Sequence, residues 1–331
     1  MATELMKNIY RIEVPLPNNP MKLLNVYLIK GDDRSLLIDT GFNRPECEEA
    51  LMGGLEEIGV DYNKTDIFLT HLHADHSGLV AKIKTNQNKL YCSRQDGQIV
   101  NSLYDDYYWE TMFEQFRIAG LKISKDLAIE THPGVMWRPK KTADGKKIPM
   151  DYVEDGDKIK VGDYQFTCIH TPGHSPGHMC LYEENKKIFF SGDMILGDIT
   201  PNLCPELFAV SSLTQYLASL DRVAKMSIDK IFVGHRNMLE DLPGRIESLK
   251  QHHADRCRET LQVLAQGPMD AWEVAAQMTW QIDAKDWDSF PPSQKWFATG
   301  EAYEHLLHLY EKALVIKRYR PDGVEYFELI E

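Results

Sequence analysis

The most informative segment of this 331-residue chain is T-H-L-H-A-D-H-S-G-L at residues 70–79. It places four side chains that can bind metal within six residues, directly after a strand predicted over residues 66–69. Because side chains alternate along a strand, His71 and His73 point the same way, and a turn after them can bring Asp75 and His76 to a neighbouring position. One short loop can therefore supply ligands to two metal ions.

Three later segments carry further candidate ligands, and each one ends a predicted strand. They are H-T-P-G-H-S-P-G-H around His174, F-S-G-D-M around Asp193 and F-V-G-H-R around His235. Imidazole and carboxylate groups are the ligands that zinc prefers, and a hydrolytic site keeps one position open for water. A lone histidine is usually a packed or surface residue. Four such segments, which we expect to meet at one sheet edge, predict a metal centre.

The rest of the first 240 residues alternates strands with helices. Strands at 26–29 and 36–41 predict a hairpin around G-D-D-R, and helical spacing predicts helices at 45–58, 77–83 and 212–225. Further strands are predicted at 89–92, 164–169, 179–182, 187–190 and 230–233. This order predicts a layered α/β domain over residues 1–240.

Two segments stand outside this alternation. Residues 97–150 read as an insertion, whose aromatic residues Tyr107, Tyr108, Trp109 and Phe113 predict a substrate-pocket wall; an ordinary core helix or a homodimer contact is the alternative. Residues 241–331 contain helices predicted at 245–266, 270–278 and 293–314 and two strands about a P-D-G turn, which predicts a helical, winged-helix-like C-terminal domain.

Composition narrows the function classes. The formal charge of −13 gives no electrostatic reason for nucleic acid binding, and residues 241–331 hold 16 acidic against 10 basic side chains, so a DNA-binding role for that domain is not favoured. The first residues do not form a secretory signal, and apolar runs are too short to span a bilayer, so we expect a cytoplasmic protein. Six scattered cysteines predict reduced, mostly buried thiols.

The pattern H-x-H-x-D-H, followed by His, Asp and His on later strands, resembles the metallo-β-lactamase fold superfamily over about residues 8–240. The resemblance implies a four-layer αββα sandwich. It implies a first metal site formed by His71, His73 and His174 and a second formed by Asp75, His76 and His235. Asp193 would bridge both sites. It also implies that Asp39, in L-I-D-T-G, supports the histidine loop by hydrogen bonds, although Asp39 could instead cap its own turn.

The resemblance further implies a hydrolase in which two divalent ions, Zn²⁺ or else Fe or Mn, activate water against an ester-like small molecule. Asp75 or a water would relay the proton. The segments S-G-D-M-I-L-G and V-G-H and the helical C-terminal extension are similar to the LACTB2-like and glyoxalase II-like branch, a match that leaves thioesters, lactones and phosphodiesters open. Of these, thioesters or lactones are the favoured prediction. A phosphodiesterase or ribonuclease of the same fold, or an iron-dependent sulfur or oxygen redox enzyme, is the alternative.

Two expectations concern other residues near the motifs. The family often carries P-G-H-G at the last ligand, whereas this chain has V-G-H-R, so Arg236 would either pair with an anionic substrate or make an outward salt bridge. The remaining histidines match no ligand position and are expected to be structural or solvent-facing: His132, His170, His178, His252, His253, His305 and His308.

Overall fold

A seven-stranded sheet forms the first half of the protein. The computed structural model describes residues 2–103, 105–132, 147–205 and 210–330. The strands follow sequence order across this sheet, antiparallel up to β4 and parallel from β4 to β7. They are β1 Ala2–Met6, β2 Ile9–Pro15, β3 Leu23–Ile29, β4 Ser35–Ile38, β5 Thr65–Phe68, β6 Leu90–Ser93 and β7 Asp151–Val153. The hairpin predicted at 26–41 is confirmed as β3 and β4.

A five-stranded sheet forms the second layer, in the order β12-β11-β10-β9-β8. Its strands are antiparallel except for the parallel pair β11 and β12. They are β8 Lys158–Val161, β9 Tyr164–His170, β10 Met179–Glu183, β11 Ile188–Gly192 and β12 Lys230–Val233. Four of these strands match the predicted ranges to within two residues.

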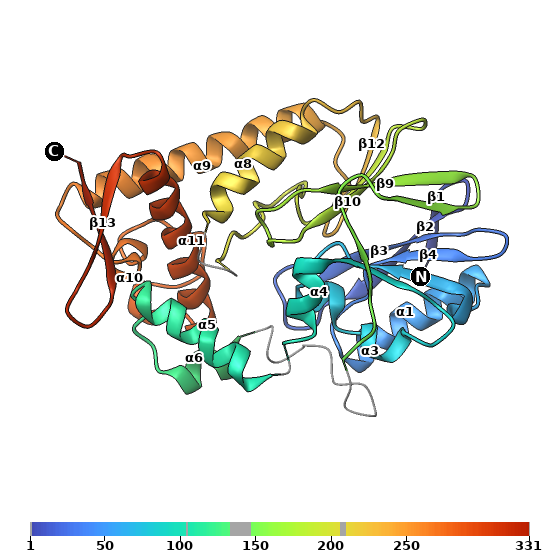
Figure 1. Ribbon diagram of the computed structural model, residues 1–331, viewed down its shortest axis with the longest axis horizontal. Helices are drawn as coiled ribbons and strands as arrows, with labels where there is room; N and C mark the ends of the chain where they lie inside the picture. The colour runs from blue at the N-terminus through green and yellow to red at the C-terminus, as the bar shows by residue number, and fades with distance from the viewer. Residues whose placement is uncertain (1, 104, 133–146, 206–209, 331) are drawn as a thin grey trace.

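The two sheets lie face to face, with helices on both outer sides (Figure 1). Alternation along β3 explains the layers: Val26 and Leu28 pack with α1, whereas Tyr27 and Ile29 pack with residues of the second sheet. The flanking helices are α1 Pro45–Ile58, α2 Ala74–Ser77, α3 Val80–Ile83 and α4 Arg94–Val100 on the first sheet, and α8 Ser212–Val223 and α9 Leu242–Leu264 on the second. The αββα sandwich is confirmed, but the helix predicted at 77–83 is wrong in outline, because two separate short helices cover that region.

The C-terminal helices gather at one end of the sandwich (Figure 1). There α10 Ala271–Ala275, α11 Pro292–Glu311 and the hairpin of β13 Val315–Tyr319 and β14 Glu325–Leu329 pack together. The segment predicted as an insertion contributes α5 Asp106–Ile118 and α6 Lys125–Thr131, and Phe116 stacks on Trp296 with ring centroids 3.9 Å apart. Two short 3-10 turns, η1 Tyr62–Lys64 and η2 Trp287–Ser289, complete the described elements.

The helix order and final hairpin follow the sequence expectation, while the winged-helix-like domain and its boundary at residue 240 stay predictions. Part of the predicted insertion, residues 133–146, lies outside the described residues. All six cysteines are free, with four buried and two partly buried, as predicted. Among the residues that the structure describes, every helix is too short or too polar to cross a membrane.

Candidate metal centre

All seven predicted ligand residues meet at one end of the space between the sheets. His71 and His73 follow β5, and α2 begins directly after them and carries Asp75 and His76. The other three come from the second sheet: His174 from the loop between β9 and β10, Asp193 from the end of β11 and His235 from the end of β12. Their ligand atoms form three overlapping groups, which confirms that the four segments converge. The expectation of a single sheet edge is wrong, because the segments come from two sheets that face each other.

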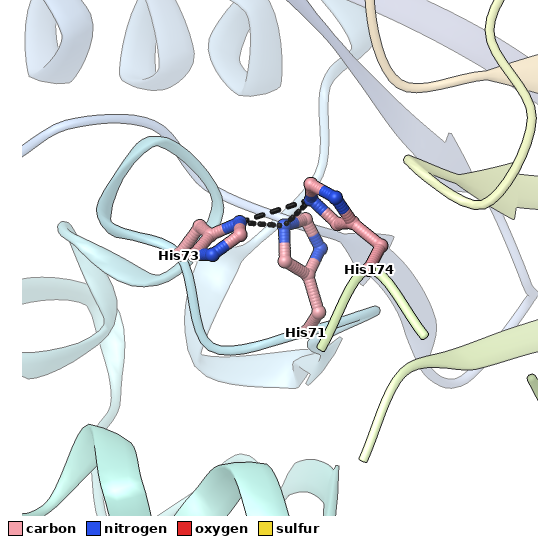
Figure 2. Close-up of side chains that lie close together, drawn as sticks. All are labelled: His71, His73 and His174. Carbon is pink, nitrogen blue, oxygen red and sulfur yellow. Dashed lines mark hydrogen bonds between the residues drawn. The ribbon is translucent and has the colours of Figure 1, made fainter. Parts of the chain in front are cut away.

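Three of the histidines form a nearly equilateral triangle of nitrogen atoms (Figure 2). His71 Nε2 lies 3.0 Å from His73 Nδ1 and 3.2 Å from His174 Nε2, and the last two atoms are 3.0 Å apart. Each imidazole nitrogen holds at most one proton, directed along one line, so three such atoms cannot all be joined by linear hydrogen bonds. Nitrogen ligands at about 2.0–2.1 Å in a tetrahedral arrangement would be about 3.3–3.4 Å apart, so this triangle fits a zinc-sized cation.

The second group is richer in carboxylates. His76 Nε2 lies 3.1 Å from His235 Nε2, and His235 Nε2 lies 3.4 Å from Asp75 Oδ2. Asp193 lies between the groups, since its Oδ2 is 3.3 Å from His235 Nε2 and 3.7 Å from His174 Nε2. Its Oδ1 is buried 3.4 Å from His76 Nε2 and has no hydrogen-bond partner among the described residues. A buried carboxylate oxygen is costly without a partner, so this orphaned atom fits a site for a cation.

Outer hydrogen bonds set which nitrogen of each ring faces inward. His174 Nδ1 and His235 Nδ1 donate to the carbonyl oxygens of Asn202 and Leu23, at 2.8 and 2.9 Å. A ring that donates from Nδ1 presents an unprotonated Nε2, which is the form that binds metal. The backbone of two distant loops therefore prepares both rings for a cation.

Asp39 does the same for the histidines of the first loop. It accepts hydrogen bonds from His76 Nδ1 at 2.8 Å, from the Thr70 backbone N–H at 2.9 Å and from Thr70 Oγ1 at 2.8 Å. Since Thr70 Oγ1 donates its proton to Asp39, it can accept one from His71 Nδ1, 3.0 Å away. Asp39 adopts a left-handed backbone, with φ of 63°. The predicted support of the histidine loop is confirmed.

Electrostatics separate the two groups. Burial and the neighbouring histidines lower the pKa of His71 well below its usual value, and burial and His73 lower the pKa of His174 to about 3. Burial also opposes the charged forms of His76 and His235, but Asp193 and other nearby carboxylates raise the pKa of His76 well above its usual value and that of His235 to about 10. The carboxylate-rich group thus attracts positive charge, which a metal ion would supply.

Two residues that support the site were not predicted. His178 is fully buried, receives the backbone N–H of Asp193 on its Nε2 at 3.2 Å and contacts Thr171 Oγ1 through Nδ1 at 2.9 Å. Asp96 is fully buried and accepts hydrogen bonds from both ligand loops. The third histidine of H-T-P-G-H-S-P-G-H offers a weak signal for His178, whereas no local pattern singles out Asp96.

The described contacts of Arg236 and of the aromatic helix bear on the alternatives predicted for them. Arg236 Nη2 donates to the Pro20 carbonyl at 3.0 Å, so its guanidinium is turned to a neighbouring loop and forms no salt bridge with a described residue. Pairing of Arg236 with an anionic substrate stays a prediction. Tyr107 is 75% exposed, whereas Trp109 is buried and packs with Leu72, the residue between His71 and His73. Trp109 therefore belongs to a core that borders the metal loop, which favours the core-helix interpretation for this side chain.

An αββα sandwich with a histidine and aspartate cluster at the ends of its strands defines a class of metal-binding proteins. The family model of the metallo-beta-lactamase superfamily matches residues 23–235, and the chain belongs to this superfamily. The human acyl-coenzyme A thioesterase MBLAC2 is 26% identical over 223 residues, covering 64% of this chain and 73% of that protein. The probable metallo-hydrolase YqjP of Bacillus subtilis is 26% identical over 294 residues, covering 84% and 86%.

Solved structures extend the likeness to nearly the whole chain. A metallo-beta-lactamase family protein of Thermus thermophilus superposes with a TM-score of 0.82 at 25% identity, covering 99% of this chain and 100% of its own. A beta-lactamase domain protein of Burkholderia ambifaria gives a TM-score of 0.78 at 21% identity, covering 99% and 95%. The C-terminal helices and hairpin are thus included in both matches.

Proposed function

We propose that the protein is a dinuclear metallohydrolase that cleaves thioesters. In this proposal one divalent ion is held by His71, His73 and His174 and a second by Asp75, His76 and His235, with Asp193 shared. Membership of the superfamily and the clustered ligands support the broader description of a metal-dependent hydrolase. The observation that carries the proposal is the position of Asp193, whose two oxygens lie beside ligands of both groups.

When bound, two divalent ions would lower the pKa of a water molecule and polarise the scissile carbonyl. Histidines without charge leave the charge of such ions largely intact, and the mixed nitrogen and oxygen ligands suit zinc, with Fe or Mn as the alternatives. Metal loading is therefore part of the proposal, and elemental analysis would measure it.

The chain's own residues supply access and a hydrogen-bond acceptor. His73 and Asp75 are partly exposed while the other ligands are buried, so substrate would approach from their side. Burial would raise the pKa of Asp75, but His76 and His235 lower it to about 2. Asp75 is therefore ionised at neutral pH, so it can hold a cation and accept a hydrogen bond from the attacking water. A proton relay by Asp75 stays a prediction.

The thioester class is supported by the likeness to MBLAC2, which is named as an acyl-coenzyme A thioesterase. Lactones are the second candidate, since the same activated water attacks any ester-like carbonyl.

A substrate comparison on metal-replete protein tests the proposal. We expect hydrolysis of acyl-coenzyme A thioesters to exceed that of lactones, phosphodiesters and β-lactams, with about two metal ions per chain by elemental analysis. The variant His71→Ala/His73→Ala should lose metal and turnover, whereas His252→Ala, outside the cluster, should keep both. Undiminished turnover in the double variant would refute the metal centre, and a phosphodiester preference would refute the substrate class.

A further inference from the structure

Asp96 joins the two loops that supply the three-histidine triangle. Its Oδ2 accepts the backbone N–H of Leu72 at 2.9 Å and the hydroxyl of Ser175, and its Oδ1 accepts the backbone N–H of Gly177 at 2.6 Å. Leu72 lies between two candidate ligands of the first sheet, and Ser175 follows the candidate ligand of the second sheet. One buried carboxylate therefore spans the joint across which the triangle is built.

The fold places Asp96 there for a topological reason. Strands β4, β5 and β6 are parallel neighbours, so their carboxyl ends share one edge of the sheet. Asp39 follows β4, the histidine loop follows β5, and Asp96 follows β6 in the first turn of α4. The two carboxylates flank the histidine loop, but Asp39 contacts His76 of the second group and Asp96 contacts neither Asp75, His76 nor His235 in any described hydrogen bond.

Local packing holds Asp96 in one position. Ser93 Oγ accepts the Asp96 backbone N–H at 3.2 Å and so caps α4. A Cβ at Gly177 would lie 2.1 Å from Ser93 Oγ and 2.6 Å from Asp96 Oδ1, so only glycine permits this approach. The second loop is thus fitted closely onto the carboxylate.

We infer that Asp96 is a positioning residue that sets the geometry of the His71, His73 and His174 metal site and not that of the second site. The inference rests on the proposed two-metal function. An asparagine of the same shape cannot replace the carboxylate, because its NH₂ group would face the N–H of either Gly177 or Leu72, whichever way the amide is turned.

Metal titration of the whole protein tests the inference. Partners that orient metal ligands are worth about 10–100-fold in metal affinity, so Asp96→Asn should weaken one of two Co²⁺ or Zn²⁺ binding steps by about that factor and leave the other unchanged. In a His235→Ala background, which keeps the triangle, Asp96→Asn should weaken the remaining step. In a His174→Ala background, which breaks the triangle, it should have no effect.

Two further variants keep the test decisive. Ser175→Ala removes one of three hydrogen bonds and should produce the same selective loss in smaller degree, even if Asp96→Asn does not fold. The matched control Asp66→Asn alters a carboxylate of β5 that accepts the Lys89 N–H and pairs with Arg34, away from both ligand loops, and should leave both steps unchanged.

The outcomes separate the inference from the proposed function. Wild-type protein that binds no metal would refute the proposed function itself. Two wild-type steps that Asp96→Asn and Ser175→Ala leave unchanged would overturn the role of Asp96 alone. Equal weakening of both steps, with apoprotein unfolding at lower urea than for Asp66→Asn, would also overturn it by reducing Asp96 to a general support of the fold.

Discussion

The substitution Gly300→Ala in the C-terminal helix α11 should disturb the metal centre through the segment that α11 contacts. A Cβ at this position would lie 2.5 Å from Cys204 Sγ and 3.2 Å from Pro205 Cδ. The segment it would push also contains Asn202, whose carbonyl accepts His174 Nδ1. Gly300 therefore connects α11 to a candidate ligand through the 202–205 segment.

The magnitude follows from two opposing contributions. Optimal separation between heavy atoms is about 3.5–4.0 Å, so the overlap with Sγ is at least about 1 Å, and such overpacking costs about 1–3 kcal/mol. Replacing glycine by alanine inside a helix stabilises by about 1 kcal/mol. The net loss of unfolding free energy should thus be about 0–2 kcal/mol, accompanied by a fall of about tenfold in zinc affinity.

A double-mutant cycle isolates the overlap. Cys204→Ala removes Sγ, so combining it with Gly300→Ala should recover about 1–3 kcal/mol relative to the sum of the single changes. Urea unfolding of the apoprotein measures the free energies, and chelator competition measures the zinc affinity. Gly53→Ala on α1, where no described atom lies within 4 Å of the Cβ position, is the matched control and should only stabilise. Additive free energies in the cycle would refute the contact.

Three further predictions follow from the same structure. Asp39→Asn removes the negative acceptor of His76 Nδ1, a charged hydrogen bond of about 1.5–3 kcal/mol, so it should lower metal affinity by about 10–100-fold in chelator competition; affinity equal to the wild type would contradict it. Removal of metal by a chelator should lower the unfolding free energy, and zinc at 100 times its dissociation constant should restore about 2.7 kcal/mol, whereas an unfolding curve insensitive to zinc would argue against a site in the folded state. Burial raises the pKa of Glu304 to about 7, so its contribution to the free energy of unfolding is lost as the pH rises from about 4.5 to 7. In urea unfolding over that window, the Glu304→Gln variant should gain free energy of unfolding relative to the wild type by up to about 1.4 kcal/mol per pH unit. A constant difference between the two proteins would show that Glu304 does not titrate there.

The candidate ligands could be predicted because each one lies in a short segment after a strand. His71, His73, Asp75 and His76 form a dense pattern by themselves, and the other three follow strands that hydrophobic runs reveal. The carboxyl ends of strands that run in the same direction meet at one edge of a sheet, which explains convergence within each sheet but not between the two sheets. Strands β1 and β2 were not predicted, although Ile12 and Val14 in β2 alternate with polar residues.

The contacts of the predicted insertion, residues 97–150, could not be predicted, because they depend on tertiary packing. The aromatic residues on α5 show helical spacing, which is the same for a pocket wall and for a core helix. Only the partner decides, and Phe116 stacks on Trp296, which lies 180 positions later in the chain. The sequence therefore does not reveal the core that Phe116 and Trp296 share.

The site lies where the two sheets are joined, and this explains why the supporting role of Asp96 could not be predicted from the sequence. The Thr70 carbonyl accepts the Met179 N–H at 2.8 Å, and the Gly234 carbonyl accepts the Asn25 N–H at 2.7 Å, so backbone hydrogen bonds link the sheets beside His71 and beside His235. A ligand residue can be recognised from its own sequence segment, but the distance between ligands of different sheets depends on groups that reach across the joint. Asp96 acts at that joint, because it lies in α4 beside the first sheet and accepts hydrogen bonds from the loop between β9 and β10, so its role exists only once both sheets have formed.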